Sequence, residues 1–122
     1  MILKNIKDLS LEEKIGQLFM IGLEEKTDEQ IKNLIQENKI GGIILYKGNY
    51  STYEEMLSYV NKIKKTNRKN NIPIFISIDQ EGGRVNRMPL EIEKIWNATK
   101  IAETKNVELV RESGRIIGEM LN

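Results

Sequence analysis

Six residues between positions 79 and 87 are of types that could catalyse a reaction or bind a ligand. They are Asp79, Glu81, Gly82, Gly83, Arg84 and Arg87. The two carboxylates could act as a general acid and base, or as ligands for a hard cation. They could equally pair with the two arginines and so order the loop. The glycine pair suits a tight turn, or a nest of backbone N–H groups that binds phosphate with help from the arginines.

The apolar residues 74–78 directly before these groups predict a β-strand that is buried on both faces. A cluster of charge after a buried strand needs a reason, because unpaired charges are costly away from water. Ligands of α/β proteins bind at the carboxyl ends of parallel strands. The segment after residue 78 is therefore the leading candidate for a functional site.

Two further apolar runs, at residues 18–21 and 43–46, also predict strands. Signals for the start of a helix lie before and between the strands, at residues 10–13, 27–30 and 51–54. Strands and helices that alternate at this spacing are typical of βα repeats with a parallel sheet. The sequence therefore predicts an α/β fold with one domain over residues 1–122.

Three glycines and one asparagine carry more specific predictions about the helices. Gly41 and Gly42 are expected to end the second helix with a positive φ. Asn106 is expected to cap a last helix, and Gly114 on the apolar side of that helix predicts a close approach to the sheet. Residues 89–104 show no strong periodicity and predict no element.

The composition excludes several kinds of site. The chain has no cysteine and no histidine, which excludes disulfides, thiolate sites and the commonest general base and metal ligand. A net charge of +1 gives no electrostatic case for nucleic acid or an anionic membrane as a partner. The basic residues within 62–69 are interpreted as the solvated end of a helix. No apolar run is long enough to span a membrane, and residues 1–8 are too charged for a signal peptide, so a cytoplasmic location is expected.

Two other side chains could belong to the same site. Trp96 could stack on a sugar ring, although packing against the fold explains it with less assumption. Asn49 follows the second strand and could contact a ligand from the same edge, or it could serve only the turn.

Residues 78–87, Ile-Asp-Gln-Glu-Gly-Gly-Arg-Val-Asn-Arg, closely resemble the signature of glycoside hydrolase family 3, and most of all its bacterial β-N-acetylglucosaminidase branch. Three more segments resemble the family in the same order along the chain. Residues 13–22 resemble its opening segment, residues 41–46 its second strand, and residues 114–121 the helix before its next strand. The chain is identified by this resemblance as the N-terminal portion of a family 3 barrel domain.

The resemblance implies a (β/α)8 TIM-type barrel that removes terminal β-linked N-acetylglucosamine with retention, through a covalent glycosyl–enzyme intermediate. Asp79 would bind sugar hydroxyls, Arg87 would belong to the substrate-binding group, and the supporting loop would consist of Glu81, Gly82, Gly83 and Arg84. The implied partner is an N-acetylglucosamine-containing glycoside, typically in cell-wall turnover. Neither a metal nor an organic cofactor is implied.

The catalytic pair of the family has no counterpart in these residues. Its aspartate nucleophile lies on a late strand, and its histidine acid/base lies in a segment that this sequence lacks. The barrel is therefore expected to be incomplete in this chain, and the chain alone is expected to be inactive. Unpaired barrel edges predict self-association. Position 48 is glycine, where many relatives have arginine.

Two other functions stay open from the residues alone. One is a non-catalytic half-barrel that acts as a binding or assembly module and pairs with itself or with a second chain. The other is a phosphate-binding βα enzyme that uses Gly82 and Gly83 with Arg84 and Arg87.

Overall fold

The computed structural model describes residues 5–92 and 94–121. Residues 1–4 of the charged N-terminal stretch lie outside the described residues. Within the described part, no helix is long and apolar enough to cross a membrane. The elements in chain order are η1 (Ile6–Asp8), α1 (Leu11–Gly16), β1 (Met20–Gly22), α2 (Asp28–Gln36), β2 (Gly42–Leu45), η2 (Lys47–Asn49), α3 (Tyr53–Asn67), β3 (Phe75–Ile78), α4 (Ala98–Glu103) and α5 (Val107–Met120).

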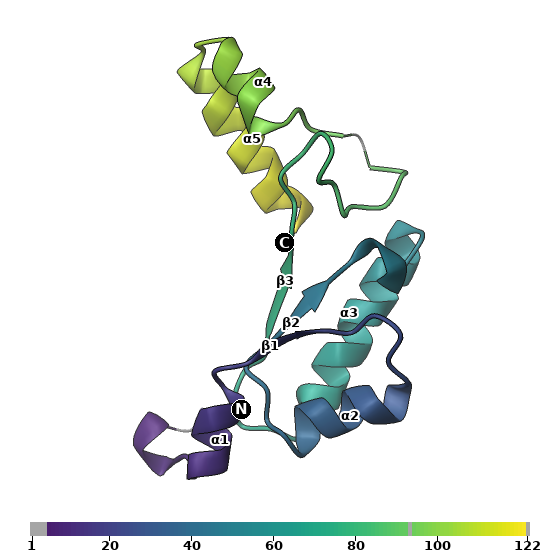
Figure 1. Cartoon of the computed structure of the whole chain (residues 1–122), viewed down its shortest axis with the longest axis vertical. Helices are drawn as coiled ribbons and strands as arrows, with labels where there is room; N and C mark the ends of the chain where they lie inside the picture. The colour runs from purple at the N-terminus through teal and green to yellow at the C-terminus, as the bar shows by residue number, and fades with distance from the viewer. Residues whose placement is uncertain (1–4, 93, 122) are drawn as a thin grey trace.

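The three strands form one parallel sheet in the order β1-β2-β3. Figure 1 shows the strands at the centre, α2 and α3 beside each other along the sheet, and α4 with α5 at the opposite end of the molecule from α1. The predicted α/β class and parallel sheet are confirmed. Because the strands are parallel, all three carboxyl ends lie at the same edge of the sheet.

One face of the sheet is buried and the other is open. Ile43 and Leu45 of β2 are 0% and 1% exposed, and they pack with α2 and α3. Met20, Gly42 and Phe75 share one row of the opposite face. Phe75 is 73% exposed, so the prediction that this strand is buried on both faces is wrong. The reason is that β3 is an edge strand, and no helix of the described chain covers its second face.

Capping boxes begin α1 and α2 at the predicted residues, and the box that begins α3 lies one residue after the predicted signal at 51–54. In α3 the Thr52 hydroxyl accepts a hydrogen bond from the Glu55 N–H at 3.1 Å, and the Glu55 carboxylate accepts from the Thr52 N–H at 3.2 Å. The helix buries Met56 and Ile63 in the core. Its basic C-terminal end is exposed, as predicted.

Replacing Thr52 with alanine is expected to lower the free energy of unfolding by about 1 kcal/mol, because the first turn loses the hydroxyl acceptor of its cap. Urea denaturation measures the change. Thr99→Ala is the matched control, since Thr99 lies exposed within α4 and caps no helix. An equal loss in both variants would contradict a role for the Thr52 cap.

The glycine predictions are wrong in two places. Helix α2 ends before Gly41 and Gly42, and Lys39 takes the positive φ of 53°. Gly41 is required for space instead, because a Cβ there would lie 2.3 Å from the Gln17 carbonyl oxygen. A Cβ added to Gly114 would meet no atom within 4 Å, so Gly114 marks no close approach to the sheet.

Asn106 caps α5, as predicted, by accepting hydrogen bonds from the Glu108 and Leu109 N–H groups. The preceding helix α4 was not predicted, because its six residues are too few to show a period.

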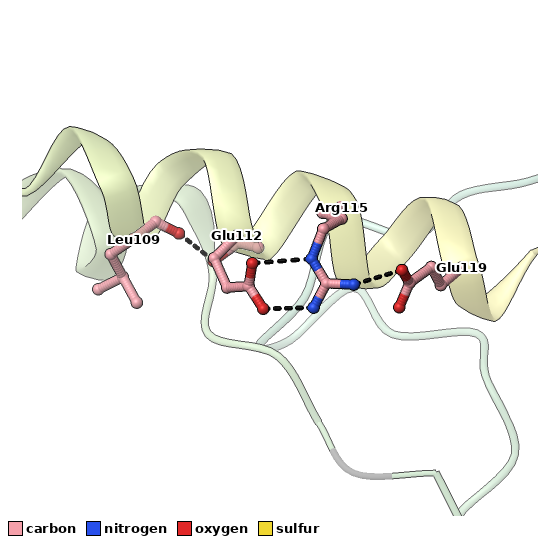
Figure 2. A network of polar contacts seen from close by, with 5 residues as sticks. Leu109, Glu112, Arg115 and Glu119 are labelled. Carbon is pink, nitrogen blue, oxygen red and sulfur yellow. Dashed lines mark hydrogen bonds and ion pairs between the residues drawn. The ribbon is translucent and has the colours of Figure 1, made fainter.

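Hydrogen bonds between side chains run along the polar side of α5. Arg115 donates to Glu112 and to Glu119 (Figure 2). The Leu109 carbonyl accepts a hydrogen bond from the Ser113 hydroxyl in the same helix. The hydrogen bonds to Glu112 and Glu119 hold the pKa of Arg115 above its usual value. The groups are exposed, so they add little to stability.

Candidate functional site

The segment between β3 and α4, residues 79–97, carries all six candidate residues and begins at the carboxyl edge of the sheet. We call it the β3–α4 loop. It leaves the end of β3 and leads away from the sheet to α4 (Figure 1). Its middle is anchored by Met88, which is 1% exposed and belongs to the core. The first part of the loop, residues 79–88, is therefore held at both ends.

Gln80 organises this first part of the loop. Its Oε1 accepts hydrogen bonds from the Arg87 N–H at 2.9 Å and from the Met88 N–H at 3.3 Å. Its Nε2 donates to Oδ1 of Asn86 at 2.6 Å. The Gln80 side chain thus holds the end of β3 against the backbone of Arg87. Asp79 and Arg87, the two predicted substrate-binding residues, therefore lie at the two ends of one closed loop.

Gly82 and Gly83 form a tight turn at the tip of that loop, with φ angles of 81° and 57°. The Glu81 N–H donates to the Val85 carbonyl at 3.0 Å, and the Gly83 N–H donates to the Ile95 carbonyl at 2.7 Å. These two N–H groups are occupied by the protein itself, which leaves them unable to cradle an anion. The arrangement supports the tight-turn interpretation of the glycines over the phosphate nest.

The charged side chains of the loop do not pair as the ion-pair hypothesis expects. Among the described residues, the ion pairs lie on α5 and between α3 and α2, and none joins Asp79 or Glu81 to Arg84 or Arg87. That hypothesis is wrong, because backbone and amide hydrogen bonds already order the loop. Asp79, Glu81 and Arg84 are exposed. No group of three acidic side chains in the described part of the chain could hold a metal ion.

Arg87 is the most constrained of the charged residues. Its carbonyl accepts a hydrogen bond from the Tyr50 hydroxyl at 3.1 Å, while its N–H donates to Gln80. Tyr50 is 6% exposed, and its burial raises the pKa of the phenol, which the positive charge of Arg87 partly offsets. The Nε of Arg87 is buried and has no hydrogen-bond partner among the described residues. A buried donor without an acceptor is unfavourable, and a ligand oxygen would satisfy it.

The two secondary candidates differ in outcome. Oδ1 of Asn49 accepts a hydrogen bond from the Tyr46 N–H at 2.8 Å, so Asn49 serves the turn after β2. Trp96 is half exposed, and Nζ of Lys100 lies 4.0 Å from the centroid of its ring. The indole therefore packs only partly against the fold.

An open depression of about 530 Å³ lies at the same edge, beside the ends of β1 and β2. It is lined by Gly22, Glu24, Glu25, Lys26 and Gly48. Gly48 has no side chain to fill this space. A Cβ there would have room, because the nearest atom would be Oε1 of Glu24 at 3.8 Å. The carboxyl edge thus offers an acidic hollow in addition to the β3–α4 loop.

Sequence reasoning missed Gln80 and Tyr50 as parts of the site. Gln80 lies within the ten-residue motif of residues 78–87, and its place in that motif could have identified it. Tyr50 gave no signal, because a buried tyrosine just before a predicted helix start is indistinguishable from a core residue. The hydrogen bond that matters joins two segments far apart in the sequence.

The comparisons with known proteins agree with this geometry. A model of the family described as "Glycosyl hydrolase family 3 N terminal domain" matches residues 10–122. A β-hexosaminidase of Photobacterium profundum is 31% identical over 108 residues, which are 88% of this chain and 31% of that protein. A β-hexosaminidase of Vibrio cholerae serotype O1 (strain M66-2) is 32% identical over 91 residues, or 74% of this chain and 27% of that protein.

Among solved structures, the fold matches a glycoside hydrolase family 3 β-N-acetylglucosaminidase from Paenibacillus sp. str. FPU-7 with a TM-score of 0.85 and 32% identity. The match covers 93% of this chain and 22% of that one. The chain therefore spans less than a third of the length of each of these three relatives.

Proposed function

Since the chain belongs to glycosyl hydrolase family 3, we propose that it supplies the sugar-binding part of a hydrolase that removes terminal β-linked N-acetylglucosamine from glycosides. The observation that carries this proposal is the buried Nε of Arg87, which lacks a partner at the end of a loop that begins with the exposed Asp79. An acceptor and a donor so placed suit a ligand rich in hydroxyl and carbonyl groups. The names of the similar proteins give the class of sugar.

In this proposal Asp79 and Arg87 bind the terminal sugar. The carboxylate of Asp79 accepts hydrogen bonds from two sugar hydroxyls, and such charge-assisted contacts are stronger than those between neutral groups. The guanidinium of Arg87 donates to a sugar oxygen, which satisfies its buried Nε. Glu81, Gly82, Gly83 and Arg84 form the supporting loop, with the glycine turn as its tip.

The reaction is proposed to be retaining hydrolysis. In such a reaction a carboxylate nucleophile and a separate acid/base group flank the glycosidic bond. The residues of this chain would bind and orient the sugar for those groups, which other parts of the barrel would provide. Neither a metal nor an organic cofactor is proposed. The proposed setting is turnover of cell-wall glycosides in the cytoplasm.

We further propose that the three strands are the first of a (β/α)8-type barrel that is incomplete in this chain. The open face with Met20, Gly42 and Phe75 would then line the barrel interior. The free edge of β3 would pair with a following strand. The same edge also supports the second candidate function, a non-catalytic half-barrel that pairs with itself, because unpaired edges invite pairing with another chain.

We expect the 122-residue chain alone to show no hydrolysis of an aryl N-acetyl-β-glucosaminide, because in this proposal the nucleophile and the acid/base group are not among its residues. The protein from its native source is expected to hydrolyse that substrate and to have an intact mass of about 28 kDa or more, as a complete barrel requires. Mass spectrometry and the aryl glycoside assay test both statements. A native mass of 14.1 kDa would favour the half-barrel module instead. Turnover by the short chain that Asp79→Ala abolishes would contradict the proposed absence of the catalytic pair.

A further inference from the structure

The Gln80 side chain makes three hydrogen bonds inside the β3–α4 loop. The proposed function assigns sugar binding to Asp79 and Arg87 and gives Gln80 no role. We propose that Gln80 is a positioning residue, which holds the backbone of Arg87 so that the guanidinium meets the same sugar as the carboxylate of Asp79. This inference rests on the proposed function of the site. It concerns a residue that touches no substrate itself.

The geometry uses both ends of the glutamine amide. Oε1 must accept from two successive N–H groups, those of Arg87 and Met88, while Nε2 donates to Asn86. Asparagine is one methylene shorter and would not reach the same three partners. An apolar side chain of similar length, such as methionine, would leave two backbone N–H groups without acceptors.

The position of Arg87 is fixed at both of its backbone polar groups. Gln80 binds the N–H, and the Tyr50 hydroxyl donates to the carbonyl. Tyr50 and the neighbouring Met88 belong to the buried core, so the second restraint is rigid. Gln80 is the restraint that connects Arg87 to the end of β3, since Asp79 and Gln80 directly follow that strand.

Other features of the loop do not replace this connection. The glycine turn orders only the tip, through the Glu81 and Gly83 N–H groups. Among the described residues, no ion pair connects the two charged ends. Without the Gln80 amide, the Arg87 and Met88 N–H groups would lose their acceptor, and Arg87 would no longer be held against the end of β3. A misplacement of about 1 Å in a substrate-positioning group reduces the rate by about 100-fold.

The test compares Gln80→Met with Gln80→Glu and with the control Gln36→Met in the protein at its native length. Gln36 also makes a hydrogen bond to a backbone group, from its Nε2 to the Thr66 carbonyl at 3.0 Å, but it lies in α2 away from the site. Three quantities are measured: kcat and KM for an aryl N-acetyl-β-glucosaminide, the unfolding midpoint, and hydrogen exchange at the Arg87 and Met88 amides.

Gln80→Met is expected to lower kcat/KM about 100-fold and to speed exchange at the Arg87 and Met88 amides. Gln80→Glu keeps an acceptor for both backbone amides, and the Asn86 amide can turn so that its NH2 group donates to the second carboxylate oxygen. It is therefore expected to restore their protection and to keep kcat/KM within about fivefold of the wild type. Gln36→Met is expected to shift the unfolding midpoint without changing kcat/KM more than about twofold. This pattern supports a positioning role. If loss of stability were the only effect, Gln80→Met and Gln36→Met would not differ in kcat/KM.

Four results would overturn the inference. Wild-type kcat/KM in Gln80→Met would show that the amide positions nothing. An equal loss of kcat/KM in Gln36→Met, or no recovery in Gln80→Glu, would show a general effect of destabilisation or of any change at this residue. Absence of turnover in the wild type would contradict the proposed function itself, and the inference with it. The wild-type measurement therefore separates failure of the function from failure of the role of Gln80.

Discussion

Replacing Asp79 with asparagine is expected to lower kcat/KM for an aryl N-acetyl-β-glucosaminide by about 10³-fold in the native-length protein. A hydrogen bond to a charged group contributes about 1.5–3 kcal/mol, and two such bonds to sugar hydroxyls would weaken together. A loss of about 4 kcal/mol corresponds to about 10³-fold in rate. The free energy of unfolding should stay unchanged, because Asp79 is exposed and makes no ion pair with another described residue.

Asp8→Asn is the matched control for this substitution. Asp8 is an exposed aspartate in η1, outside the candidate site, and its change should leave kcat/KM within about twofold of the wild type. Steady-state kinetics and urea denaturation on the same samples separate binding from folding. If Asp79→Asn retained wild-type kinetics, or lost activity only in proportion to a loss of stability, Asp79 would not bind the sugar.

Gly82→Ala is expected to lower the free energy of unfolding by roughly 2–5 kcal/mol and to disrupt the site. The φ of 81° at Gly82 is unfavourable for any residue with a Cβ. The added Cβ would also lie 2.5 Å from the Trp96 carbonyl oxygen and 2.8 Å from that of Ile95. Both contacts are with backbone, so no side-chain rotation can relieve them, and the loop tip must separate from residues 95 and 96.

Gly48→Ala provides the control for this second prediction. Gly48 lies at the same edge of the sheet, its φ is not positive, and the nearest atom to its added Cβ would be Oε1 of Glu24 at 3.8 Å. Its substitution is expected to change the free energy of unfolding by no more than about 0.5 kcal/mol. Denaturation midpoints that fall equally in both variants would contradict the close packing described at Gly82.

The sequence predicted the elements whose signals are local. Capping boxes at Ser10, Thr27 and Thr52 act over three residues, and the first two lie where they were predicted, while the third lies one residue later than predicted. The strands were found from their apolar runs, and their parallel order follows from the helices between them. Helix α4 was missed because six residues give too few turns for a period to emerge.

Burial and hydrogen-bond partners could not be predicted in the same way, because they depend on tertiary neighbours. Phe75 has the sequence of a buried strand residue, yet it is exposed because no described helix covers the face of the sheet on which it lies. Charges close in sequence suggested ion pairs in the β3–α4 loop, whereas the glutamine amide orders it. Gly41 is needed because of the Gln17 backbone, which lies far from it in the sequence.

The strand order β1-β2-β3 also determines how the sheet can assemble. Each strand pairs with the next one in the chain, so β1 and β2 can dock with α2 between them while later residues are still leaving the ribosome. β3 then joins at an edge that already exists, and no earlier pairing has to break. The strand order therefore allows the sheet to grow in the direction of synthesis, and the Asp79–Arg87 segment can close against the sheet only after β3 has joined it.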